Sequence, residues 1–162
     1  MPKRTRHISL KKKAEMVDAI IDHYIKVRKR KNFPKKIVEP VLKLVFPESH
    51  YIGRGFHKVV HAIYSRSFKR VIKISNFKST NRDWDLYHRL PRTIRNLYFA
   101  KIYWHTKYCS LQKFGRKAVV PQVQLEKLKR RVKQYGLTDV RAENIRKFGK
   151  GFKIIDAYPA RT

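Results

Sequence analysis

Two acidic residues and an asparagine stand out in the segment TDVRAENIRKFGKGFKIIDAY. Four residues separate Asp139 from Asn144, and Asp156 follows twelve positions later, at the end of the apolar run FKII. Phosphoryl transfer needs a carboxylate that accepts or orients the substrate proton and two oxygen ligands that hold Mg²⁺ against nucleotide phosphates. Each residue alone is more often a turn-former or a helix cap, but the order and spacing of the three favour this chemistry.

Two features upstream carry compatible chemistry. Gly53 and Gly55 flank Arg54, and Val60 follows them, where the sequence first becomes strand-like. Glycines let a hairpin backbone approach a phosphate chain closely, and a valine can cover an adenine ring; an ordinary tight turn is the alternative. Lys73 lies inside the apolar stretch RVIKIS, where its ammonium group needs a polar partner. Phosphate oxygens beside an acid would serve, and extension to solvent from an edge strand is the alternative.

The elements that position these residues follow from hydrophobic spacing. Apolar residues at three- and four-residue intervals predict helices, whereas clustered β-branched residues predict strands. The expected helices are 9–30, 34–46, 81–90 and 123–135. The expected strands are 57–64, 70–74, 97–108 (in part a helix as the alternative), 118–120 and 152–156. The first two strands read as one hairpin, the last strand closes another, and Gly136 is placed to end the fourth helix.

The charge balance is the strongest compositional signal. The 162 residues include 41 Lys and Arg against 11 Asp and Glu, for a formal charge of +30. Such a charge favours a polyanionic partner, although basic helix faces that are merely solvated are the alternative. Lys and Arg make up 13 of the first 36 residues. The expected polyanion-binding residues are Lys11, Lys12, Lys13, Arg28, Lys29, Arg30, Lys31, Lys35 and Lys36. RNA is favoured slightly over DNA because no helix-turn-helix spacing is convincing.

Other compositional features bear on compartment. The single Cys109 excludes an internal disulfide, fits a reducing compartment and is expected to be a packed thiol. The sequence has no apolar run long enough to span a bilayer and no secretory signal, so we expect a cytoplasmic protein.

In its order of glycine loop, strand lysine, helix acid, catalytic loop and metal acid, residues 51–158 resemble the protein-kinase-like superfamily. The likeness is to its compact branch, shared by small-molecule phosphotransferases and atypical kinases. The resemblance implies ATP and Mg²⁺ as cofactors. The implied nucleotide-binding residues are Gly53, Gly55, Val60, Lys73 and Asp83. Asp83 would be the helix acid that pairs with Lys73, with Asp85 as the competitor. Asp139 is the implied catalytic acid residue, acting with Lys73, and Asn144 and Asp156 are the implied metal ligands.

The resemblance also implies an α+β fold with a kinase-like core. We expect a basic helical extension over 1–47 and a minimal kinase-like domain over 48–162. Its antiparallel N-lobe sheet would lie within about 48–120, and a reduced C-lobe of one helix, catalytic loop and hairpin within about 121–162. One departure is Lys58, which stands where a third glycine is usual. Another is length, because the sequence ends six residues beyond Asp156. We therefore expect a C-terminally truncated member, with a protein partner as one way to complete the C-lobe.

The sequence thus predicts an ATP-dependent, kinase-like phosphotransferase with an unidentified acceptor. The alternative, from a different class, is a catalytically weak or inactive kinase-like scaffold. Such a scaffold would bind nucleic acid, with RNA favoured, or a nucleoprotein assembly through its basic surface.

Overall fold

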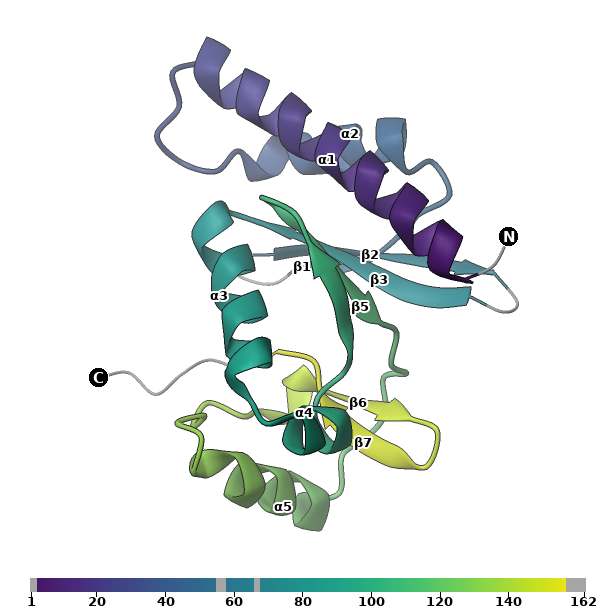
Figure 1. The fold of residues 1–162 in the computed structure, drawn as a ribbon, viewed down its shortest axis with the longest axis vertical. Coiled ribbons are helices and arrows are strands. Elements are labelled where there is room, and N and C mark those ends of the chain that lie inside the picture. The colour runs from purple at the N-terminus through teal and green to yellow at the C-terminus, as the bar shows by residue number, and fades with distance from the viewer. Residues whose placement is uncertain (1–2, 55–57, 66–67, 157–162) are drawn as a thin grey trace. The chain divides into compact units, whose positions relative to one another are not determined.

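The computed structural model describes residues 3–54, 58–65 and 68–156 (Figure 1). It has an α+β fold that divides into two compact units. Unit 1 comprises residues 1–84 and 102–113, and unit 2 comprises residues 85–101 and 114–162. The expected division at residue 47, and the further division near residue 120, stay predictions.

Two helices open unit 1. Helix α1 spans Lys3–Val27, and helix α2 spans Lys35–Val45 directly after Pro34. Both confirm expected helices, although α1 begins earlier and ends before Arg30. Their apolar stripes are buried because residues three and four apart lie on the same side of a helix. The buried members include Leu10, Ala14, Val17, Ile21, Val38, Val41, Leu42 and Val45.

Five antiparallel strands complete unit 1, in the order β1-β2-β3-β5-β4. They are β1 (His50–Arg54), β2 (Lys58–Ser65), β3 (Phe68–Ser75), β4 (Ile102–His105) and β5 (Cys109–Lys113). The predicted hairpin is confirmed as β2 and β3, which pair from Lys58↔Ser75 to Ser65↔Phe68. Because β3 pairs with both β2 and β5, it is the central strand of the sheet.

The two faces of this sheet differ in character. Val59, Ile63, Ile72, Ile74 and Leu111 alternate onto one face, which shares a single apolar core with α1 and α2. Figure 1 shows the two helices lying over the sheet on one side. Residues at the intervening positions therefore project to the opposite face. This second face carries Lys58 and Lys73.

Helix α3 (Phe77–Arg89) connects β3 to the rest of the chain and confirms the predicted helix at 81–90. Its residues up to Trp84 belong to unit 1. A short helix α4 (Arg92–Tyr98) follows in unit 2. For residues 97–108, the alternative of a partial helix is therefore confirmed at the first residues, which end α4, and the strand prediction is confirmed over β4.

Unit 2 is built from α4, helix α5 (Gln122–Lys133), a 3₁₀ turn η1 (Ala142–Asn144) and a two-stranded hairpin. The hairpin strands are β6 (Ile145–Phe148) and β7 (Gly151–Ile154). Gly136 has φ +76°, which confirms that a glycine in the left-handed region ends α5. Residues 118–120 form no strand; that prediction is wrong because they only cross to Pro121, after which α5 begins.

None of the helices in the described ranges has both the length and the apolar character that a membrane crossing requires.

Candidate functional site

Lys73 lies on the central strand β3 and is 8% exposed. Its cross-strand neighbours are Val60 on β2 and Ser110 on β5. Directly opposed residues in an antiparallel sheet project to the same face, so Val60 and Lys73 lie side by side on the face away from α1 and α2. The structure thus brings together the residues predicted to cover an adenine ring and to bind phosphate.

A second buried lysine shares this face. Lys58 is 5% exposed and lies two residues before Val60 on β2, opposite Ser75. Its ammonium group forms an ion pair with the carboxylate of Asp83 on α3. An Arg82 guanidinium nitrogen lies 3.6 Å from the other Asp83 oxygen. The helix acid therefore does meet a sheet lysine, and Lys58 is a partner that sequence reasoning missed.

The signal for Lys58 was present in the alternation of β2. A residue two positions before Val60 must share its face, because the side-chain period of a strand is two. The resemblance to protein kinases instead placed Lys58 where a third glycine is usual, and so predicted no ion pair for it.

Gly53 is in β1 and pairs with Val60. A Cβ built on Gly53 would meet no atom within 4 Å, and its φ is not in the left-handed region. The fold itself therefore does not require a glycine at this position. Open space next to a backbone is what close approach by a ligand needs. Gly55, the other predicted glycine, lies outside the described residues.

Asn144 and Asp156 come together in unit 2. Ile145 pairs with Ile154 at the open end of the β6–β7 hairpin. One step further, the Ile155 N–H donates a hydrogen bond to the Asn144 carbonyl oxygen at 2.8 Å. Asp156 is the next residue along, so the hairpin places the two predicted metal ligands at the same end. Both residues are half-buried.

Asp139 lies in the loop between Gly136 and η1. The loop is anchored by two buried residues, Leu137 at 1% and Val140 at 2% exposure. Arg141 Nε donates a hydrogen bond to Asp139 Oδ1 at 2.8 Å, and the Asp139 side chain is 41% exposed. Arg141, a residue that sequence reasoning did not single out, thus balances the charge of the predicted catalytic acid.

The described residues contain no cluster of three or more His, Cys, Asp or Glu side chains that would hold a metal ion. A divalent cation would instead have the Asn144 amide oxygen and the Asp156 carboxylate as its protein ligands. Mg²⁺ is usually bound by one or two protein oxygens together with substrate phosphates and water, so two ligands suffice chemically.

The predicted site residues fall into the two units. Gly53, Val60, Lys73 and Asp83 belong to unit 1, whereas Asp139, Asn144 and Asp156 belong to unit 2. Strand pairing brings Gly53, Val60 and Lys73 together in unit 1, and the hairpin places Asn144 and Asp156 at one end in unit 2. A single site formed by both groups stays a prediction.

The predicted N-terminal polyanion residues form two groups. Lys11, Lys12 and Lys13 lie in the first half of α1. The second group begins just after α1 with Arg28 and ends in the first turn of α2 with Lys35 and Lys36. A rise of 1.5 Å per residue separates Lys12 from Arg28 by about 24 Å. The two groups therefore do not form one compact patch on α1.

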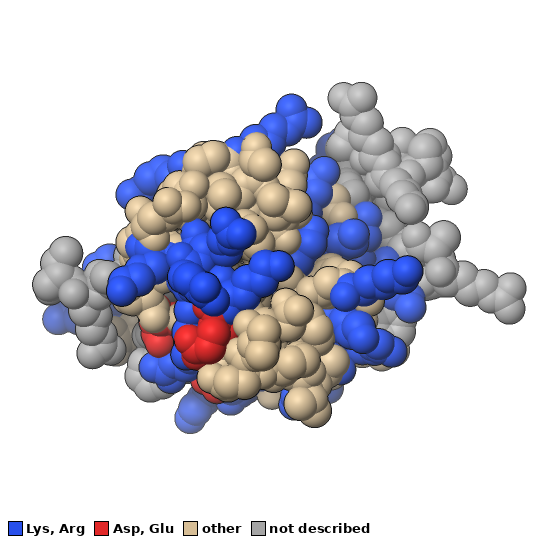
Figure 2. Space-filling view, turned by 90° about the horizontal axis from the view of Figure 1, so that it is seen from below, with Lys and Arg blue, Asp and Glu red and all other residues tan. Residues whose placement is uncertain are grey.

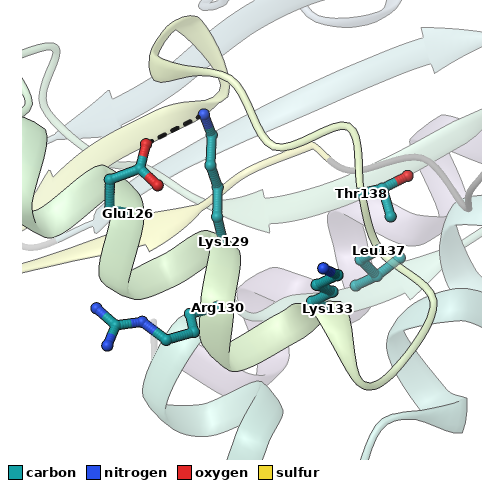
Figure 3. A pocket seen from close by; sticks show the side chains of 6 residues that line it. All are labelled: Glu126, Lys129, Arg130, Lys133, Leu137 and Thr138. Carbon is teal, nitrogen blue, oxygen red and sulfur yellow. Dashed lines mark hydrogen bonds and ion pairs between the residues drawn. The ribbon is translucent and has the colours of Figure 1, made fainter.

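A pocket of about 500 Å³ lies beside α5 in unit 2 (Figure 3). It is lined by Glu126, Lys129, Arg130, Lys133, Leu137 and Thr138. The sequence shows that α5 is rich in basic residues, but it does not predict this pocket. The pocket itself depends on the reversal of the chain at Gly136, which brings Leu137 and Thr138 back along the helix.

No model of a known protein family matches this chain, and no curated protein sequence matches it.

Proposed function

We propose that this protein is an ATP-dependent phosphotransferase with a kinase-like core. Lys73 would bind the nucleotide phosphates, Val60 would cover the adenine, and Asp139 would orient the acceptor hydroxyl. Asn144 and Asp156 would hold Mg²⁺. The acceptor is not identified by these residues.

The observation that carries the proposal is the position of Lys73. A lysine at the centre of a five-stranded sheet is costly to bury, and an apolar residue would serve a purely structural role better. In protein kinases the phosphate-binding lysine lies on the third strand of such a sheet, and the following helix carries an acid. Here Lys73 lies on β3, and α3 with Asp83 follows directly.

The residues present fit a magnesium nucleotide in three respects. Gly53 leaves open space at the end of β1, where a phosphate chain would approach the backbone. Lys58 and Lys73 place two ammonium groups on one sheet face beside Val60. The Asn144 and Asp156 pair supplies the oxygen ligands that Mg²⁺ prefers. When bound, the metal would neutralise charge that develops on the transferred phosphate.

The protein's own groups have distinct tasks in this proposal. Asp139 would accept a hydrogen bond from the acceptor hydroxyl and so aim its oxygen at the phosphate. Arg141 fixes the position of the Asp139 carboxylate by its charge-assisted hydrogen bond. The Lys58–Asp83 pair joins β2 to α3, and so holds the strand next to Lys73 in place.

Nucleotide binding is tested by thermal unfolding with ADP or a slowly hydrolysed ATP analogue, with and without Mg²⁺. At a hundredfold excess over the dissociation constant, binding stabilises the folded state by about 2.7 kcal/mol. We expect Lys73→Met to abolish the shift, and Asp156→Asn to abolish only its Mg²⁺-dependent part. Lys69→Met, an exposed lysine on the same strand, is the matched control. The proposal would be refuted if millimolar nucleotide did not shift the thermal unfolding of the unmodified protein.

Transfer is tested separately with ATP labelled on its terminal phosphate, using the protein itself and mixed RNA as acceptors. Asp139→Asn should abolish transfer while leaving the nucleotide-induced thermal shift intact. Equal transfer by the Asp139→Asn variant and the unmodified protein would remove Asp139 from the proposed mechanism.

The second candidate is a kinase-like scaffold that binds RNA through its cations. The formal charge of +30 and the cation-lined pocket beside α5 favour it. Nucleotide binding without any phosphate transfer, together with RNA binding that is unaffected by Asp156→Ala, would support the scaffold over the enzyme.

A further inference from the structure

Helix α5 has one apolar and one basic side. Leu125, Leu128 and Val132 are buried in unit 2. Glu126, Lys129, Arg130 and Lys133 follow the i, i+3, i+4, i+7 spacing of a single helix face, so their side chains project together. This face forms one wall of the pocket in Figure 3.

The opposite wall comes from the chain after α5. Gly136 adopts φ +76° and reverses the backbone, after which Leu137 is buried and Thr138 remains exposed. Figure 3 shows the segment with Thr138 and Leu137 running beside the last turns of α5, with Lys133 next to Leu137. The result is a hollow with a hydroxyl group on one side and cations on the other.

The charge of the pocket favours an anion. Glu126 is the one carboxylate in the lining, and it lies 3.5 Å from Lys129 Nζ. Three cations, one carboxylate and a helix C-terminus of about −0.5 charge leave a net charge of roughly +1.5. Within the described part of the chain, neither Arg130 nor Lys133 has an acidic partner. Figure 2 views the molecule from the end where α5 lies in Figure 1 and shows Lys and Arg gathered there around few acids.

We propose that this pocket binds single-stranded RNA, with backbone phosphates on Lys129, Arg130 and Lys133 and one unpaired nucleotide in the hollow. The volume of about 500 Å³ suits a group of nucleotide size. A duplex keeps its bases stacked and would need only a flat basic surface, whereas unpaired RNA nucleotides can turn outward into a pocket. The Thr138 hydroxyl and the Glu126 carboxylate can hydrogen-bond a ribose 2′-hydroxyl, which distinguishes RNA from DNA.

This site uses none of the residues assigned to phosphoryl transfer, so it stands or fails independently of the proposed enzyme activity, and it gives the RNA-binding alternative a specific site. It is also distinct from the N-terminal Lys and Arg residues that the sequence predicts to bind a polyanion. Those cations lie in two separate groups, whereas the three cations of α5 line one hollow.

The test is fluorescence anisotropy of a short labelled single-stranded RNA of mixed sequence with the full chain, without nucleotide. The pocket variant is Lys129→Gln/Arg130→Gln/Lys133→Gln. For single strands each phosphate contact contributes about 0.7 to the logarithmic salt slope, so the variant should lower the slope by about 2. The affinity near 0.1 M salt should fall by about 100-fold.

The matched control is Lys43→Gln/Lys69→Gln/Lys78→Gln, which removes the same charge from exposed positions in unit 1. Screening should limit its effect to about 3-fold. Because cations near the end of α5 also stabilise the helix, Thr138→Glu provides a second variant that keeps them. It places a carboxylate in the pocket and should weaken RNA binding by about 5-fold. Thermal melting checks that each variant is folded.

Three results would overturn the proposal. One is an equal loss of RNA affinity in the pocket and control variants. Another is equal or tighter binding of duplex DNA, or of single-stranded DNA of the same sequence, through the same three cations. The last is competition by polyglutamate as effective, per charge, as competition by unlabelled RNA, which would assign the pocket to acidic proteins.

Discussion

Lys58 on β2 and Asp83 on α3 form an ion pair in which the two side chains are only 6% and 16% exposed. The two residues are 25 positions apart in sequence, and their pair joins β2 to α3 on the sheet face that also carries Lys73. Removing one member of such a pair leaves a buried charge without its main partner, which costs more than the pair itself contributes.

We expect Lys58→Met to lower the free energy of unfolding by about 3 kcal/mol, because Asp83 would lose its Lys58 partner at a largely buried position. Urea denaturation measures this loss. The double variant Lys58→Met/Asp83→Leu should lose less than the sum of the two single variants, since it removes both charges. Lys129→Met is the control, because its ion pair with Glu126 is exposed and should contribute less than about 1 kcal/mol. Equal losses for Lys58→Met and Lys129→Met would contradict this expectation.

Two glycines should respond oppositely to alanine. Gly136 has φ +76°, so Gly136→Ala should cost about 1 to 2 kcal/mol of unfolding free energy. Gly53 has no positive φ and open space around it, so Gly53→Ala should leave stability unchanged or slightly raised. If a nucleotide approaches this backbone, Gly53→Ala should nevertheless weaken its binding by about 10-fold, as measured by calorimetry. Unchanged nucleotide affinity in Gly53→Ala would separate Gly53 from the nucleotide site.

Asp18 should make the protein more stable on mild acidification. Its carboxylate accepts hydrogen bonds from the backbone N–H groups of Lys107 and Tyr108, both at 3.0 Å. Burial raises the pKa of Asp18, and hydrogen bonds from Thr106 and the two backbone N–H groups oppose that rise only in part. The folded state therefore binds this proton more tightly than the unfolded chain does. The contribution of Asp18 should improve as the pH falls through the folded pKa towards about 3.9.

The measurement is the difference in unfolding free energy between the unmodified protein and each of Asp18→Asn and Asp22→Asn, from about pH 7 to about pH 2. The unmodified protein should gain relative to Asp18→Asn on acidification. For Asp22 we expect the opposite effect, a loss of stability on acidification. Burial tends to raise the pKa of Asp22, but hydrogen bonds from Lys107 and Tyr108 and the charge of Lys107 lower it overall. Relative to Asp22→Asn, the unmodified protein should lose stability only as the pH falls below about 3.9. Parallel profiles for the two variants would refute both assignments.

Cys109 should be inert in the folded protein. It is fully buried, and burial together with the nearby charge of Asp18 raises the pKa of its thiol well above the ordinary value. Because the thiolate is the reactive form, a disulfide reagent at pH 8 should label Cys109 slowly in buffer and rapidly in urea. Rapid labelling without denaturant would show that the β4–β5 turn opens readily.

The helices were largely predictable, because an apolar stripe at helical spacing must be buried whatever surrounds it. Leu10, Ala14, Val17 and Ile21 illustrate this on α1. The strand over 118–120 failed because two consecutive valines cannot form a strand without a partner to pair with. For 97–108 the sequence left a strand and a partial helix open, because aromatic residues suit either, and the structure has the end of α4 and then β4 there.

The candidate site was predictable only as a set of residue types. The lysine and oxygen-bearing residues can be read from the sequence, and so can the strand or loop in which each falls. The partner of Asp83 could not be read from the sequence. Lys58 and Lys73 lie on the same sheet face, and local spacing does not show which of them reaches Asp83. The pocket beside α5 was equally hidden, since its second wall depends on how the chain reverses at Gly136.

By itself, the sequence determined the excess of positive charge, the apolar stripes of α1, α2 and α5, and the order of residues suited to phosphoryl transfer. These are properties of composition and of short-range periodicity, which every conformation of the chain retains. Only the tertiary structure decided that Lys58 holds Asp83, that Asn144 lies at the same hairpin end as Asp156, and that three cations of α5 face Thr138 across a hollow. Such pairings depend on strand register and chain reversal, in which a shift of a single residue redirects a side chain to the opposite face.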